Sequence, residues 1–240
     1  MSSRRTLVSL GLAVTALAVV PGGASAAKIT EVGTVTDGKA PRCPDACSVV
    51  TRTTALPTSV DGNRNVYVVP SDGRIVAWSI TLGTPSDDDR KALEKQLGRA
   101  SAGLVVLRRG KSVAGSAVAG SSVKKLDPYF GGETTFALPQ SIAVKKGDVI
   151  GLTVPTWAPA LVQGYGTNTS WRASRPTGRC GGTTDERKKD YYVDTTLAVG
   201  KSGTFNCLYK AERMSYTATL VPTPTTTKKK AASRSTKATR

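Results

Sequence analysis

Short segments in which apolar and polar residues alternate constrain the fold of this chain more than any other feature. Between Arg74 and Leu82, the apolar residues Val76, Trp78 and Ile80 fall at every second position. A period of two places alternate side chains on opposite faces of a strand, so this segment predicts a half-buried β-strand with Trp78 in the core. Other candidate strands, separated by Gly, Pro and Asp, span residues 65–69, 104–107, 112–118, 135–138, 142–144, 149–154, 161–164, 170–173, 192–199, 204–209 and 214–221. This pattern predicts an all-β fold, a two-sheet antiparallel β-sandwich of jelly-roll type.

One segment has the signals of a helix instead. Ser86 is a good N-cap residue, three aspartates follow it at 87–89, and Gly98 is a typical stop. Acidic side chains are favourable at the positive end of the helix dipole, which we prefer over the alternative of a calcium site at the aspartates. We expect one short helix inserted between strands, with Ala92, Leu93 and Leu97 facing a sheet.

The N-terminus has the layout of a secretory signal peptide. Arg4 and Arg5 form a cationic head, Leu7–Val20 is an uncharged apolar run, and Ala24-Ser25-Ala26 is a small-residue cleavage site. The paired arginines leave twin-arginine and ordinary export both open. The apolar run is shorter than the roughly 20 residues that span a bilayer. We therefore expect cleavage near Ala26 and a secreted or cell-envelope-associated protein that does not span a membrane.

Charge and composition divide the chain into a leader at 1–26, a β-sandwich domain at 27–221 and a disordered Thr/Pro-rich, then basic, tail at 222–240. The net charge is +17, from 34 Lys and Arg against 17 acids, which favours anionic partners. Because an exported protein does not meet chromosomal DNA, we expect cell-wall polyanions or polysaccharides rather than nucleic acid. The predicted electrostatic contacts of the tail are Lys228, Lys229, Lys230, Arg234, Lys237 and Arg240.

Four cysteines in an exported chain predict two disulfides, and local closure favours Cys43–Cys47 and Cys180–Cys207. A zinc site built from all four is disfavoured, because it normally needs two closely spaced pairs. The chain contains no histidine, which excludes Ser-His-Asp catalysis and histidine metal sites. We expect no metal and no cofactor.

The segments 73–80, 105–108, 144–152 and 154–160 carry a family resemblance. Their residues GRIVAWSI, VVLR, VKKGDVIGL and VPTWAPA resemble secreted actinobacterial proteins of unknown function. Those proteins look like jelly-roll sandwiches and are broadly similar to carbohydrate-binding modules. The resemblance covers roughly residues 45–221. It implies the sandwich fold and no particular activity.

Aromatic residues in the loop-rich second half are the candidate ligand contacts. Flat rings on loops stack on sugars and on cations. The candidates are Trp157, Tyr165, Trp171, Tyr191 and Tyr192. In the alternative interpretation, Trp157 and Trp171 plug the open ends of the sandwich. Basic residues at turns, such as Arg108 and Arg109, would form a shared anion-binding face only if their loops gather at one end.

Catalytic patterns are weak, and we assign no catalytic residue. Ser121 and Lys124 match S-x-x-K but lie in a Gly/Ser loop without the accompanying motifs. Glycoside hydrolysis needs two carboxylates, and spacing selects no pair among Glu133, Asp148, Asp185, Glu186, Asp190 and Asp194.

We expect a secreted, non-catalytic binding or envelope-associated protein that contacts a glycan or an anionic wall polymer. Two alternatives stay open, a carbohydrate-active hydrolase or lyase that uses a carboxylate pair and a structural extracellular protein without a ligand. The sequence leaves the oligomeric state open.

Overall fold

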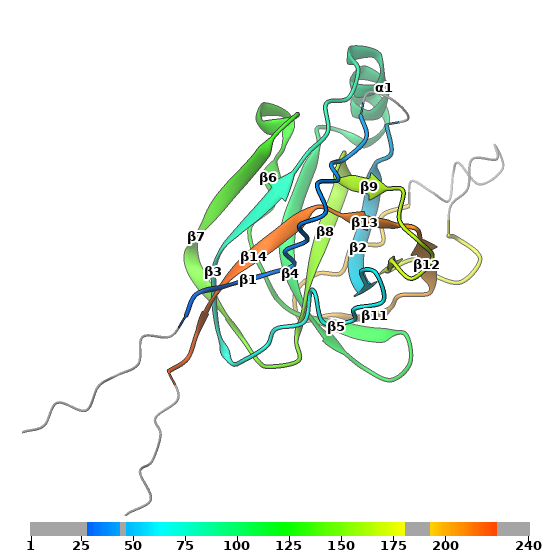
Figure 1. The fold of residues 1–240 in the computed structure, drawn as a ribbon. Helices are drawn as coiled ribbons and strands as arrows, with labels where there is room; N and C mark the ends of the chain where they lie inside the picture. The colour runs from blue at the N-terminus through cyan, green and yellow to red at the C-terminus, as the bar shows by residue number, and fades with distance from the viewer. Residues whose placement is uncertain (1–27, 44–46, 181–192, 225–240) are drawn as a thin grey trace, which may run out of the picture.

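The computed structural model describes residues 28–43, 47–180 and 193–224 (Figure 1). The predicted leader, Tyr191, Tyr192 and the basic residues of the tail lie outside these ranges. Within them, no helix is long and apolar enough to cross a membrane.

Two antiparallel sheets form the body of the fold, as predicted. The small sheet has the order β1 (Thr30–Val32), β14 (Tyr216–Pro222), β3 (Gly73–Thr81) and β7 (Glu133–Val144). The large sheet has the order β11 (Ser202–Thr204), β5 (Ala114–Gly120), β4 (Ser101–Arg109), β8 (Val149–Ala158), β2 (Val50–Ser59), β10 (Ser170–Ala173) and β12 (Cys207–Lys210). The short β6 (Lys124–Lys125) also pairs with β4, and η1 (Asp127–Tyr129) is a 3-10 turn. β9 (Leu161–Gln163) and β13 (Glu212–Met214) form a separate two-stranded ribbon.

The alternating segment forms β3, with a shift in its buried face. Trp78 and Ile80 are fully buried, as predicted, but Ile75 is buried in place of Val76. Opposite β14, Ile75 pairs with Leu220 and Ala77 with Thr219, so Val76 is an extra residue in β3, and this bulge moves the apolar face by one residue. The pairing of β3 with β7 is irregular at the same place. Periodicity in the sequence does not reveal such a bulge.

Several of the predicted strands change. The segments at 135–138 and 142–144 belong to one strand, β7, whose bulge separates them. Residues 65–69 form turns with an isolated bridge from Val68 to Val149 rather than a strand. Of the strand predicted at 192–199, the described residues 193–199 contribute only a bridge from Thr195 to Thr53.

The single α-helix, α1, spans Asp87–Leu97, as the capping signals predicted. The Ser86 hydroxyl accepts a hydrogen bond from the Asp89 N–H at 3.1 Å, and the chain leaves the helix at Gly98. Leu97 is buried and Leu93 is half-buried, but Ala92 is exposed, which corrects the predicted sheet-facing set. Of the three predicted residues, Leu93 and Leu97 are therefore the two that the fold covers.

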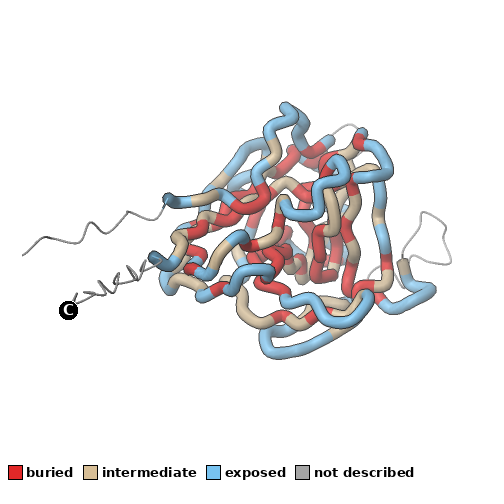
Figure 2. The backbone as a smooth tube through the Cα atoms, turned by 60° about the horizontal axis from the view of Figure 1, so that its bottom comes forward, coloured by how far each residue is buried: buried red, intermediate tan, exposed pale blue. Residues whose placement is uncertain are grey.

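The core lies between the two sheets, where Figure 2 shows buried residues gathered. Trp78 from the small sheet and Ile150 from the large sheet are fully buried there. The Tyr216 hydroxyl joins the layers by donating to the Ile150 carbonyl at 3.0 Å. The burial of apolar side chains between two sheets is the main contribution to the stability of a β-sandwich.

Residues 193–199 and Phe205, which flank the edge strand β11 in the sequence, pack on the outer face of the large sheet. The Leu197 N–H donates to the Thr54 hydroxyl of β2 at 2.9 Å, and Phe205 is fully buried against the sheet. A Cβ at Gly115 on β5 would lie 2.9 Å from the Phe205 ring, so only glycine allows this close approach. The large sheet is thus packed on both faces over part of its area.

Both predicted disulfides are confirmed, Cys43–Cys47 and Cys180–Cys207. The predicted boundary of the tail moves, because β14 includes Pro222 and the Thr223 N–H donates to the Asp72 carbonyl. Residues 225–240 lie outside the described part of the chain.

Candidate functional site

Trp157 is a core residue. Its side chain is fully buried, its indole N–H donates to the Gly98 carbonyl at 2.9 Å, and its ring packs on Phe130. A ring that is enclosed on all sides has no face left for a sugar. The open stacking surface expected for Trp157 is therefore absent, because the strand end carries the ring inward to meet the C-terminus of α1.

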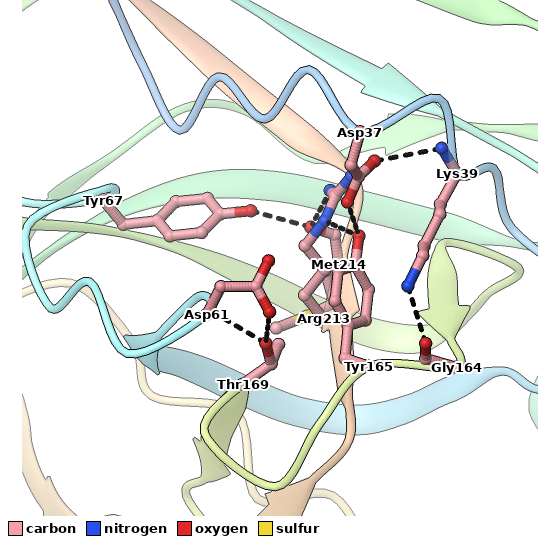
Figure 3. Close-up of polar contacts among 9 residues, drawn as sticks. All are labelled: Asp37, Lys39, Asp61, Tyr67, Gly164, Tyr165, Thr169, Arg213 and Met214. Carbon is pink, nitrogen blue, oxygen red and sulfur yellow. Dashed lines mark hydrogen bonds and ion pairs between the residues drawn. The ribbon is translucent and has the colours of Figure 1, made fainter.

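Tyr165 is buried in a network of charged residues (Figure 3). Its hydroxyl donates to the Asp37 carboxylate and accepts from Arg213 Nε at 2.6 Å. Lys39 Nζ lies 4.1 Å from the centroid of the Tyr165 ring and donates to the Gly164 carbonyl. These contacts fasten the N-terminal segment to the β9–β13 ribbon.

The opposite charges of Asp37 and Arg213 meet at the Tyr165 hydroxyl. Burial alone would raise the pKa of Asp37, but hydrogen bonds from Tyr165 and the Lys39 N–H and the charge of Arg213 outweigh it and lower that pKa. Burial, with the hydrogen bond to Asp37, raises the pKa of Tyr165 to about 12. Arg213 is only 5% exposed, and a buried guanidinium needs such partners. The network is a structural clamp, which corrects the expectation of Tyr165 as an open ligand contact.

Trp171 is also buried, but its surroundings differ. Its ring is stacked on Tyr209 of β12, with centroids 4.5 Å apart and planes at 16°. Its indole N–H donates to Glu212 Oε1 at 3.1 Å, and Gln163 Nε2 donates to Glu212 Oε2 at 3.2 Å. The carboxylate of Glu212 is thus held by two neutral donors from different strands.

These residues line a pocket of about 300 Å³, here called the Trp171–Glu212 pocket. Its lining combines two rings, a carboxylate, an amide and the guanidinium of Arg175. Arg175 is 3% exposed and donates to the Thr51 carbonyl at 2.8 Å. The lining residues are Cys47, Ser48, Val49, Val50, Thr51, Leu161, Gln163, Trp171, Arg175, Tyr209 and Glu212.

Sequence reasoning found Trp171 but missed its polar partners. Gln163, Arg175 and Glu212 come from β9, the end of β10 and β13, which only the folded topology brings together. Glu212 follows Ala211, a non-glycine residue at φ 62°, which turns the chain between β12 and β13. No local pattern distinguishes such a residue from an ordinary surface acid.

The candidate carboxylate pairs take other roles or lie apart. Asp148 is buried and accepts two hydrogen bonds from Arg108, at 2.9 and 3.0 Å, so it is structural. Glu133 shares a cleft of about 270 Å³ with Glu31 on the outer face of the small sheet. These two lie on β7 and β1, three strand spacings apart, which is about 14 Å between backbones. Asp185, Glu186 and Asp190 lie outside the described residues.

The remaining motifs gain no catalytic partner. The Asp194 carboxylate accepts from the Thr196 N–H, a local turn contact. Ser121 accepts from the Leu104 N–H and donates to the Ser122 carbonyl, with no contact to Lys124 among the described residues. Within the same ranges, no group of His, Cys, Asp or Glu is arranged to hold a metal ion.

Comparison of the chain with models of protein families, with curated proteins and with solved structures finds no match.

Proposed function

We propose that this protein is an extracellular, non-catalytic binding protein that holds a glycan in the Trp171–Glu212 pocket. The observation that carries the proposal is the orientation of the Glu212 carboxylate by Trp171 and Gln163. A carboxylate has about four acceptor sites, and two donors leave the others for ligand hydroxyls. Among the described residues no cation pairs with Glu212, so a hydroxylated ligand meets an acceptor that is already fixed in place.

The manner of contact differs from stacking on an open ring. Trp171 is 4% exposed, so it offers its edge and a rigid wall rather than a platform. Affinity then comes from hydrogen bonds to Glu212, Gln163 and Thr51 inside a pocket of fixed shape. Pockets of this size that combine apolar walls with few, well-placed polar groups are typical of small-ligand sites.

Two features support an extracellular localisation, the disulfides and the predicted signal peptide. Two disulfides are stable in oxidising compartments and rare in reducing ones. The proposed signal peptide at 1–26 would deliver the chain there, and the basic tail would retain it on wall polyanions through salt-sensitive attraction. The resemblance to secreted actinobacterial proteins remains a prediction.

A hydrolase is the second candidate, and the described carboxylates favour it less. Glycoside hydrolysis requires carboxyl groups about 5 to 9.5 Å apart across the scissile bond. Glu31 and Glu133 share a cleft but lie three strands apart, and the Trp171–Glu212 pocket contains a single carboxylate among its lining residues.

The test compares Glu212→Gln with the control Glu94→Gln on α1, which removes the same charge outside the pocket. Each purified protein is bound to isolated bacterial cell wall across a salt series, with soluble wall-glycan fragments as competitors. We expect Glu212→Gln to raise the concentration of glycan fragments needed to displace the protein at least tenfold. Glu94→Gln should leave that concentration unchanged. Equal binding by both variants would remove the pocket from the proposal. Release of reducing ends by the unmodified protein, but not by Glu212→Gln, would favour the hydrolase.

A further inference from the structure

A further cavity, of about 350 Å³, lies on the outer face of the large sheet. It contains three arginines that come from distant parts of the chain. Arg64 lies in the β2–β3 connection, Arg109 ends β4, and Arg172 lies in β10. We call this cavity the arginine groove, and its lining residues are Leu56, Thr58, Ser59, Arg64, Arg109, Ser112, Val113, Ala114, Ser170, Arg172 and Leu208.

The arginine groove is separate from the Trp171–Glu212 pocket. Successive residues of a strand point to opposite faces of the sheet. Trp171 lines the pocket on one face, while its neighbours Ser170 and Arg172 line the groove on the other. Tyr209 and Leu208 of β12 divide between the two cavities in the same way. The groove therefore does not depend on the proposed glycan site.

Neutral acceptors hold two of the guanidinium groups in place. Arg172 Nη1 donates to the carbonyls of Phe205 and Asn206, at 3.0 and 3.2 Å. Arg109 Nη2 donates to the Pro57 carbonyl at 3.4 Å. A guanidinium has five N–H donors, so these contacts position the groups and leave most donors for a ligand.

The positive charge of the groove is not neutralised within the described residues. Among the residues that the structure describes, no carboxylate lines the groove and no ion pair reaches Arg64, Arg109 or Arg172. The nearby Asp61 instead accepts a hydrogen bond from Thr169. Arg64 and Arg109 line the same groove and carry like charges; burial, and then the charge of Arg64, lower the pKa of Arg109. A bound anion would relieve the repulsion between these like charges.

The rest of the lining indicates what carries the anion. Leu56, Val113 and the 41% exposed Leu208 give the groove an apolar side that suits a carbon skeleton. None of the described lining residues is aromatic, so this lining lacks the stacking platform that single-stranded nucleic acids use. Guanidinium groups match the geometry of phosphate-type oxyanions, and donors from three segments can contact the several oxygens of a tetrahedral anion.

We propose that the arginine groove binds a phosphate or sulfate ester group of an extended polyol or glycan polymer. The arginines hold the anionic group, and the leucines contact the carbon skeleton beside it. The sequence analysis grouped Arg109 with Arg108 as basic residues of one turn. The fold shows that the two side chains have different surroundings. Arg108 pairs with Asp148, whereas Arg109 joins Arg64 and Arg172.

The experiment uses the full chain and two variants, Arg64→Gln and Arg109→Gln, singly and combined. The control is Arg90→Gln on α1, which removes the same charge beyond the far end of β4, a strand about 26 Å long. A second control changes Lys228, Lys229 and Lys230 to Gln. The probes are dextran sulfate, long-chain polyphosphate, inorganic phosphate, neutral dextran and a single-stranded oligonucleotide, each titrated across a salt series. Thermal unfolding establishes that each variant is folded.

We expect dextran sulfate and polyphosphate to bind, and the double variant to lose at least tenfold in affinity. Loss of two anion contacts should also reduce the slope of log affinity against log salt by about 1.4. Arg90→Gln should leave both values unchanged. Equal losses in Arg90→Gln, or binding that disappears only in the tail variant, would overturn the proposal. Binding of inorganic phosphate as tightly as the polymers, or a preference for the oligonucleotide that depends on the same arginines, would overturn the polymer assignment.

Discussion

Replacing Tyr165 by Phe removes one oxygen atom from the centre of the clamp in Figure 3. That hydroxyl donates to Asp37 and accepts from Arg213, so the change deletes two hydrogen bonds to charged groups. The ring itself stays, and Lys39 keeps its position over the ring face. The substitution therefore tests the polar network without opening a large cavity.

The expected loss follows from the exposure of the two partners. Asp37 is 22% exposed at its side chain and retains the Lys39 N–H, so water replaces much of what it loses. Arg213 is 6% exposed at its side chain and keeps Asp37 only at 3.5 Å, so its Nε loses a close acceptor that water replaces poorly. A buried group left without its partner costs about 1 to 3 kcal/mol, and we expect about 2 to 3 kcal/mol in total. In a domain of this size that lowers Tm by about 4 to 12 °C.

Urea unfolding followed by circular dichroism measures the free energy of unfolding of each variant. The control is Tyr129→Phe, the same chemical change at a ring whose hydroxyl makes no hydrogen bond among the described residues. We expect that control to stay within about 0.5 kcal/mol of the unmodified protein. If Tyr165→Phe also stays within that range, the clamp contributes nothing and the reasoning from burial is wrong.

Other predictions test the covalent, steric and ionisable features of the fold. Replacing the Cys180–Cys207 bridge, which has a sequence separation of 27, by two serines should lower the free energy of unfolding by about 3.5 kcal/mol in urea titrations. Gly151→Ala should cost about 1 to 3 kcal/mol, because its Cβ would lie 2.6 Å from the Ala55 carbonyl, whereas Gly132→Ala meets nothing within 4 Å and should be tolerated in thermal melts. The pKa values of Tyr67 and Tyr165 are both raised to about 12. The folded state therefore holds these protons more tightly, and the stability they contribute is present below about pH 10 and lost from pH 10 toward 12. Denaturation midpoints across that range should fall less steeply in Tyr165→Phe.

Local signals predicted the fold well wherever a short stretch of chain determines the outcome. The helix at 87–97 is bounded by its own cap and glycine, and the alternation around Trp78 identifies a strand and the buried positions Trp78 and Ile80. The bulge at Val76 could not be predicted, because it depends on pairing with β14 and β7, which are distant in the sequence. Loop composition likewise could not show whether an aromatic ring is open or covered.

The candidate sites depended still more on distant contacts. Trp171 was found by its residue type, but Glu212 and Gln163 became partners only through the β9–β13 ribbon. The arginine groove joins residues separated by more than a hundred positions, and no acid is among its described lining residues. The net charge of the chain predicted an anionic partner. The fold was needed to show where the positive charge of the protein is concentrated.

Alternate residues of β10 line two different cavities. Both cavities therefore depend on the number of residues in that strand as well as on which residues they are. Trp171 and Arg172 are adjacent, so a single inserted residue would exchange the faces to which they point. The guanidinium would then enter the space of the indole, and the indole would face solvent beside Leu208. Point substitutions in β10 can alter one ligand site alone, whereas inserting or deleting one residue ahead of Trp171 disables both sites together.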